Sequence, residues 1–210
     1  MPTDLEPLFY GGHHGSLLAS KTPLVNKQLV DYTDKFLVSR AALYAEVQGA
    51  QVACTHLSAR LAIPYDGAHG SSEGQQRYEI QTVLDFMAAQ ADGRPQLMLG
   101  DWNCGPDGGP NSEARAEFPE NYALVRADGW GDQNVDTGAP FATWSPANTL
   151  YIADATPPAA LDHIFVKGAG VRDTRRILDQ PVNVSPAGEP PFVSNLSDHY
   201  GMRATVFFDP

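Results

Sequence analysis

Frequent glycines and prolines divide the sequence into short apolar segments. The chain has 19 Gly and 17 Pro, and these residues fall mainly between the apolar runs. Such punctuation predicts many strands joined by loops. The length of 210 residues is sufficient for one domain with a sizeable core, and no internal repeat divides it. We therefore expect a single domain over residues 1–210.

Apolar runs and their spacing predict the main elements. Residues 77–90 place apolar side chains at 80, 83, 84, 86 and 87, the spacing of the buried stripe of an amphipathic helix. Short helices are predicted at 112–118 and 121–127. Strands alternating with one clear helix predict a mixed α/β sandwich rather than a doubly wound parallel sheet. The predicted strands are 16–20, 36–47, 50–58, 96–103, 161–168 and 199–208, with a tight turn at Gln48-Gly49.

Charge and composition limit the possible partners. The net charge is −11, and no basic stripe is visible, which counts against tight nucleic-acid binding by charge alone. A polyanionic substrate held through a divalent cation stays possible. No run of 18 apolar residues predicts a transmembrane helix, and MPTDLEPLFY lacks the features of a signal peptide. The sequence leaves open the oligomeric state and a cytoplasmic or secreted location.

Cysteine usage gives no metal motif. Cys54 and Cys104 have no partner at the spacing of a zinc site. Two free thiols are the default reading, and a single disulfide is the alternative.

Polar residues interrupt four predicted strands where they enter or leave the core. The interruptions are THL (55–57), GDWN (100–103), LDHI (161–164) and SDH (197–199). Each alone is weak evidence, because Asp and Asn commonly form turns at strand ends. Together they suggest a ligand site, since such sites form where several strand ends converge. The residues concerned are His56, Asp101, Asn103, Asp162, His163, Asp198 and His199.

These residue types suit phosphoester hydrolysis. Carboxylates are hard oxygen donors that suit Mg²⁺, Mn²⁺ or Ca²⁺ better than zinc. A His hydrogen-bonded to an Asp keeps one tautomer and can take a proton from water. Neutral Asn and His donors can hold a phosphate oxygen without adding negative charge. The combination predicts attack of water on a phosphoryl centre, assisted by a metal ion.

The same motifs resemble a known family. THLSA, LMLGDWN, LDHIFV and NLSDHYGMRATV, in this order, resemble the endonuclease/exonuclease/phosphatase superfamily, which includes DNase I and the neutral sphingomyelinases. GSLLASKTPL (15–24) and SRAALYAEV extend the resemblance to residues 15–208, leaving 1–14 as an atypical segment. The resemblance implies a four-layer α/β sandwich, with two facing mixed β-sheets flanked by helices. It also implies hydrolysis of phosphodiester bonds that depends on a divalent metal.

The resemblance assigns the proton-transfer and metal residues. It implies that His199 is the general base, or the acid for the leaving group, and that Asp162 orients His199. It implies that Asp101 contacts the metal or the attacking water. Asp198 would be a metal ligand or lie directly behind one.

Further roles concern the substrate and the scaffold. The resemblance implies that Asn103 holds the scissile phosphate and that His56 contacts phosphate oxygens or protonates the leaving oxygen. It gives no fixed role to His163, which we expect to be structural. Arg77 resembles a buried structural arginine that ties loops together.

The chain also departs from the family pattern. The family has an Asn on its first strand and a metal-binding Glu soon after, both upstream of the segment that matches 15–24. Glu6 is the sole Glu there and is a poor candidate beside Pro7, and His13-His14 is best read as a loop. The resemblance therefore predicts that the N-terminal strands of the family domain are missing, through a truncated product, an omitted N-terminal part or a natural short form. We expect weak Mg²⁺ binding and slow turnover by this chain.

Three functions stay open from the sequence. The first is a phosphodiesterase acting on nucleic acid or a phospholipid headgroup. His56 resembles the DNase I and sphingomyelinase-like branches, and TWSPANTL (143–150) resembles a loop of sphingomyelinase-like and related bacterial members. The acidic charge favours a small or lipid phosphodiester. The alternatives are a phosphomonoesterase for a sugar or inositol phosphate, and a non-catalytic binding module.

Overall fold

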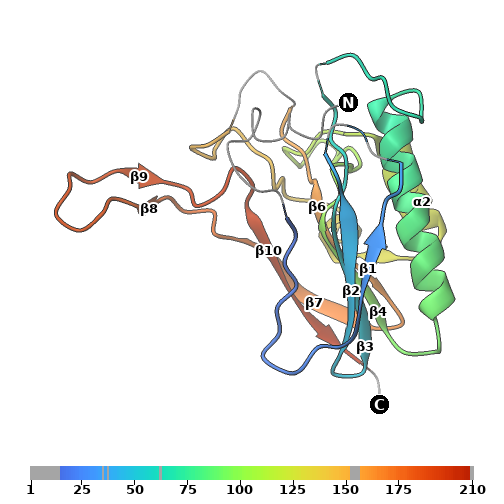
Figure 1. The fold of residues 1–210 in the computed structure, drawn as a ribbon. Helices are drawn as coiled ribbons and strands as arrows, with labels where there is room; N and C mark the ends of the chain where they lie inside the picture. Colours follow the sequence, from blue (N-terminus) through green and yellow to red (C-terminus); the bar gives the residue numbers. More distant parts are fainter. Residues whose placement is uncertain (1–14, 35, 37, 62, 152–156, 209–210) are drawn as a thin grey trace.

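A six-stranded sheet forms the centre of the computed structural model, which describes residues 15–34, 36, 38–61, 63–151 and 157–208 (Figure 1). The strand order is β1-β2-β3-β4-β6-β5. Neighbouring strands are antiparallel except β3 and β4, which are parallel. The strands are β1 (Val25–Asp31), β2 (Ala41–Val47), β3 (Ala50–His56), β4 (Gln96–Asp101), β5 (Gly131–Asp132) and β6 (Asp162–Lys167).

Helix α2 (Ser72–Gln90) makes the connection that the parallel pair β3 and β4 requires. It begins at an N-cap, Ser71, whose side chain accepts a hydrogen bond from the backbone N–H of Gly74. Its buried face includes Ile80, Val83, Leu84 and Met87, as the apolar spacing predicted. The helix starts five residues before the predicted position 77, because the capped first turns bury polar side chains instead of apolar ones.

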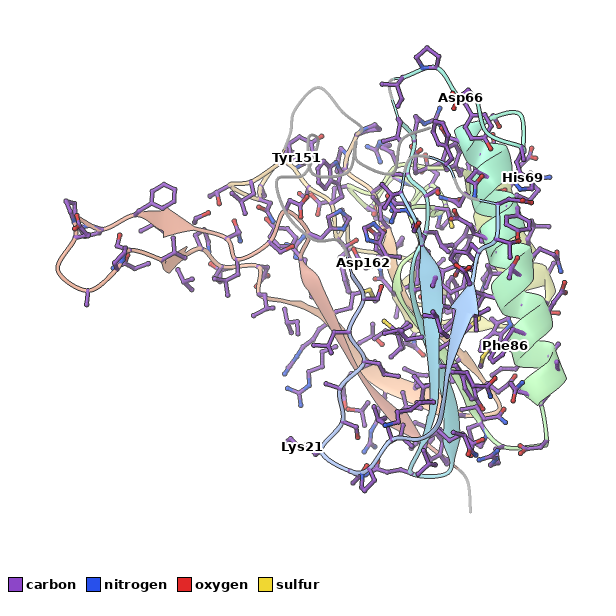
Figure 2. All side chains as sticks on the ribbon, in the orientation of Figure 1. Lys21, Asp66, His69, Phe86, Tyr151 and Asp162 are labelled. Atoms are coloured by element: carbon purple, nitrogen blue, oxygen red, sulfur yellow. The ribbon has the colours of Figure 1, made fainter. Side chains whose placement is uncertain are left out.

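Alternating side chains of the central strands build two apolar cores. Met98 and Phe165 face α2 and α3 (Pro119–Ala127), and Phe86 lies on this side of the sheet (Figure 2). Leu97 and Val166 face the opposite way and pack with the antiparallel pair β7 (Gly170–Ile177) and β10 (Gly201–Phe207). Figure 1 shows α2 and the β7–β10 pair on opposite sides of the central sheet. The predicted mixed α/β sandwich is confirmed.

Several predicted elements differ from the structure. Residues 16–20 form no strand, and β1 follows instead at 25–31. Strand β1 was not predicted, because it is an edge strand whose side chains are mostly exposed and form no apolar pattern. Among the described residues of the predicted strand 36–47, only β2 is a regular strand.

The loop region contains one of the two predicted short helices. The helix predicted at 121–127 is present as α3, and a single further turn, α4 (Gln133–Asp136), follows β5. Residues 112–118 are not helical. Their backbone bonds distant segments instead: the N–H of Glu117 donates to the carbonyl of Gly105, and that of Arg115 donates to Pro158.

A hairpin of two short strands, β8 (Val182–Asn183) and β9 (Val193–Ser194), projects from the body of the molecule (Figure 1). It was not predicted, because its proline-rich and glycine-containing sequence resembles a loop. Among the described helices, none is both long and apolar enough to cross a membrane.

Candidate active site

Three adjacent strands place His56, Asp101 and Asp162 in one row across the sheet. His56 on β3 is the register partner of Asp101 on β4, and Asp101 is the partner of Asp162 on β6. Register partners point to the same face, and here it is the face that packs against β7 and β10. Asp162 lies toward the end of the sheet opposite the loop that carries Lys21 (Figure 2). The sheet register alone therefore brings three predicted site residues together.

His199 joins this row from the loop that precedes β10. Its Nδ1 lies 2.8 Å from Oδ2 of Asp162, and its Nε2 lies 4.0 Å from Oδ2 of Asp101. His56 approaches Asp101 from the other side, with 3.4 Å between Nε2 and Oδ2. With Nδ1–H donating to Asp162, the Nε2 of His199 is left to face Asp101. Asp101 thus stands between the two imidazoles.

The positive charge near Asp101 and Asp162 does not balance the negative charge of the two carboxylates. Burial raises the pKa of Asp101 to about 7, and the negative charge of Asp162 adds to this rise. Burial opposes the charge on His199, but the hydrogen bond and charge of Asp162, together with Asp101, raise its pKa to about 9. The negative charge of Asp162 contributes to both rises, so carboxylate charge is in excess in this half-buried place. A cation would relieve this excess.

The donor atoms fit a divalent cation. One ligand atom from each of Asp101, Asp162 and His199 lies within 4.8 Å of the other two. Carboxylate oxygens are the donors preferred by Mg²⁺ and Mn²⁺. Asp198 is outside this cluster: it is exposed, and its Oδ1 accepts a hydrogen bond from Oγ of Ser197 at 3.2 Å. Its proposed contact with a metal stays a prediction.

Asn103 supports the site from beneath. Its backbone N–H donates to Oδ1 of Asp101 at 2.9 Å, and its Nδ2 donates to the carbonyl of Leu57 at 2.9 Å. A φ of +47° makes this turn possible, in the left-handed region that Asn tolerates better than most residues. Asn103 therefore joins the end of β4 to the segment after β3, and its predicted contact with phosphate stays a prediction.

Comparisons with known proteins show the family of this chain. Residues 4–199 match the Endonuclease/Exonuclease/phosphatase family. The chain belongs to this family. No curated protein matches the sequence.

Solved structures share the family fold at low identity. Sphingomyelinase C from Streptomyces griseocarneus is 21% identical with a TM-score of 0.59 over 88% of this chain. A beta toxin from Staphylococcus aureus is 18% identical with a TM-score of 0.61 over 89%. D. rerio TDP2 complexed with a single-strand DNA product is 14% identical with a TM-score of 0.57 over 88%. This chain spans 65%, 65% and 68% of those three chains, respectively.

His163 and Arg77, which were expected to be structural, differ in burial. His163 is fully buried and bonds Asp132 and the carbonyl of Cys104. Arg77 was predicted to be buried, but its side chain is 47% exposed. It still links elements, because its Nε donates to Oδ1 of Asn121 at the start of α3.

Cys54 and Cys104 are free thiols, whereas Glu6 and His13-His14 lie outside the described residues.

Sequence reasoning missed Thr143 as a residue that positions the site. Its Oγ1 accepts hydrogen bonds from the backbone N–H groups of Leu161 and Asp162, both at 3.1 Å. Its carbonyl accepts the N–H of Tyr200 at 2.8 Å. One buried residue thus holds the backbones that carry Asp162 and His199. The only signal in the sequence is TWSPANTL, which resembles a family loop and begins with Thr143.

Trp144, the next residue, packs on the catalytic candidate itself. Its ring centroid lies 5.1 Å from that of His199, with a tilt of 55° between the rings. This contact and the hydrogen bond to Asp162 together restrict the imidazole orientation.

Proposed function

We propose that this family member hydrolyses phosphodiester bonds with the help of a divalent cation, Mg²⁺ or alternatively Mn²⁺ or Ca²⁺. One observation carries the proposal: Asp101, Asp162 and His199 bring donor atoms within 4.8 Å of one another at the end of the central sheet. The arrangement combines a cation site with a paired imidazole. Each can assist the attack of water on a phosphorus centre at neutral pH.

His199 is the proposed general base. Asp162 accepts the Nδ1–H of His199. A cation held by Asp101 and Asp162 would lower the pKa of His199 from about 9, so that Nε2 loses its proton and can take one from the attacking water. A general base of this kind contributes ~10²–10⁴-fold to the rate. The water oxygen forms a bond to phosphorus while the ester bond to the leaving oxygen breaks, and the leaving oxygen then takes up a proton. His56, on the other side of Asp101, is the proposed donor to a phosphate or leaving oxygen.

Asp101 and Asp162 are the proposed carboxylate ligands of the cation. The cation would neutralise charge on the phosphate and polarise the attacking water. Mg²⁺ prefers about six oxygen ligands, and the described cluster offers few protein donors. Weak, millimolar binding and slow turnover follow from this small number of ligands.

The net charge and the similar structures together favour one class of phosphodiester substrate. One neighbour is a sphingomyelinase C and another is TDP2 with a DNA product, so the fold serves both lipid and nucleic-acid enzymes. The net charge of −11 disfavours a long polyanion, whose many phosphates would repel the surface. We therefore place a small or lipid phosphodiester ahead of DNA.

The test is hydrolysis of bis-p-nitrophenyl phosphate by the purified chain, followed by release of p-nitrophenolate. We expect a slow rate that rises with millimolar Mg²⁺ and falls to background on addition of EDTA. The monoester p-nitrophenyl phosphate is the matched substrate and should react more slowly. A hydrolysis rate that EDTA does not lower, or faster hydrolysis of the monoester than of the diester, would overturn the proposal.

A further inference from the structure

Arg40 brings a fixed positive charge to the edge of the candidate site. It lies directly before β2, is half-buried, and its Nη1 donates to the backbone carbonyl of His56 at 3.1 Å. Burial dominates the pKa of Asp101, but the positive charges of His199 and Arg40 both lower it. The guanidinium is therefore held beside His56 and acts electrostatically on the carboxylate at the centre of the site.

The charge of Arg40 is not used for an ion pair within the described residues. Elsewhere in the fold arginines pair with carboxylates at short range, as Arg94 does with Glu46 and Arg126 does with Asp136, each with 2.6 Å between nitrogen and oxygen. Arg40 has no such carboxylate within 4.0 Å in the described part of the chain. A half-buried guanidinium without an anionic partner is a ready site for an external anion.

Arg40 also lines a cavity at the edge of the candidate site. Its lining includes Arg40 and His56, with two hydroxyl side chains on the polar side and two leucines on the apolar side. The polar and apolar parts together suit an ester, which carries both a charged phosphate and an uncharged substituent. These four flanking residues are Ser16, Ser39, Leu29 and Leu43.

We propose that Arg40 binds the anionic phosphate of the substrate in this cavity, next to His56. The inference rests on the proposed phosphodiesterase function and names a substrate-binding residue for it. A phosphodiester carries one negative charge, and Asp101 and Asp162 would repel it. The planar guanidinium can keep Nη1 on the carbonyl of His56 and still offer other N–H groups to a non-bridging oxygen. Arg40 thus supplies the charge complementarity that the carboxylates do not.

The experiment measures anion binding without turnover. Dimethyl phosphate, a stable phosphodiester anion, is titrated into the isotope-labelled chain in EDTA and followed by NMR chemical shifts. Neutral trimethyl phosphate is the matched probe. We expect Arg40→Met to weaken the binding of dimethyl phosphate about tenfold, as loss of one charge-assisted hydrogen bond should. Binding of trimethyl phosphate should be weak in both proteins.

Two further variants control for charge and folding. Arg203→Met removes an exposed arginine on β10 and should leave the binding of dimethyl phosphate unchanged. Arg40→Lys keeps the charge but not the planar fork, and intermediate binding is expected. Thermal unfolding of each variant checks the fold, and if Arg40→Met does not fold, Arg40→Lys against Arg203→Met decides the question.

The outcomes separate this inference from the proposed function. Equal weakening by Arg40→Met and Arg203→Met, or a wild-type chain that does not prefer dimethyl over trimethyl phosphate, would overturn the role of Arg40. If dimethyl phosphate binding depends on Arg40 but bis-p-nitrophenyl phosphate is not hydrolysed, the anion site stands and the hydrolase proposal fails. If hydrolysis occurs and Arg40→Met changes neither anion binding nor KM, only the inference about Arg40 fails.

Discussion

Two Asp–His pairs start from neighbouring residues of β6 and differ in their surroundings. Asp162 pairs with His199 at 2.8 Å, and His163 pairs with Asp132 at 2.7 Å. The side chains of Asp162 and His199 are 22% and 20% exposed, whereas those of His163 and Asp132 are 0% exposed. Because side chains alternate along a strand, one pair faces the second sheet and the other faces the helical core.

The spare nitrogen distinguishes the two pairs. His163 directs Nδ1 to Asp132 and Nε2 to the carbonyl of Cys104 at 2.8 Å. A carbonyl only accepts, so Nε2 must donate, and with Nδ1–H donating to the Asp132 carboxylate the ring carries both protons. No nitrogen of His163 is then left for proton transfer. In His199 only Nδ1 is hydrogen-bonded in this way. A short Asp–His distance alone therefore does not identify a catalytic base.

The largest expected effect is the loss of hydrolysis when the partly exposed pair of Asp162 and His199 is disrupted. His199→Ala should lower the hydrolysis of bis-p-nitrophenyl phosphate by ~10²–10⁴-fold, because it removes the proposed general base. The melting temperature in Mg²⁺ should change little, since solvent and the cation can compensate for the half-exposed imidazole. Rates and thermal unfolding are measured on the same samples. If activity and stability fell together, His199 would be structural and the contrast with His163 would disappear.

The buried pair should respond in the opposite way. His163→Ala leaves Asp132 buried without its cation, which is expected to cost about 3–5 kcal/mol of unfolding free energy. Chemical denaturation at neutral pH measures this loss. Any folded fraction should keep a hydrolysis rate per folded molecule close to that of the wild type, because His163 faces away from Asp101 and His199. A stable His163→Ala protein with no activity would give His163 a catalytic role instead.

The sequence predicted the row of catalytic candidates because short motifs marked the ends of β3, β4 and β6. Asp101 follows the apolar run of β4, and Asp162 precedes the apolar run of β6. Such short apolar runs predict buried strands. The fold class followed from the same runs. Alternation along LDHI could also have separated Asp162 from His163, since successive strand residues point to opposite faces.

Other parts depended on contacts that leave no pattern in the sequence. The Nη1 of Arg40 bonds a backbone carbonyl sixteen positions along the chain, and any residue could supply that carbonyl. Thr143 likewise bonds backbone N–H groups of β6. Arg77 was misplaced because α2 begins at Ser72, and the phase of that helix buries Gln76 and turns Arg77 outward. Long-range contacts decided the positions of Arg40 and Thr143, and the start and phase of α2 decided that of Arg77.

The smallest expected effect is the pH dependence of stability that comes from the buried pair. Burial opposes the charge on Asp132, but the charge and hydrogen bond of His163 leave its pKa below the ordinary value. Burial likewise opposes the charge on His163, yet Asp132 leaves the pKa of His163 raised. The contribution of Asp132 is therefore lost as the pH falls below the unfolded Asp value of about 4, and that of His163 declines as the pH rises above the unfolded His value of about 6.5.

The comparison that isolates this effect is the wild type against the double variant Asp132→Asn/His163→Gln. The difference in unfolding free energy should be greatest between about pH 4 and 6.5 and should fall on both sides, by at most about 1.4 kcal/mol per pH unit for each proton. Titration of His199 affects both proteins alike and cancels in the difference. A difference that stayed flat from pH 4 to 9 would mean that the buried pair carries no charge. Its contrast with Asp162 and His199 would then be one of burial alone.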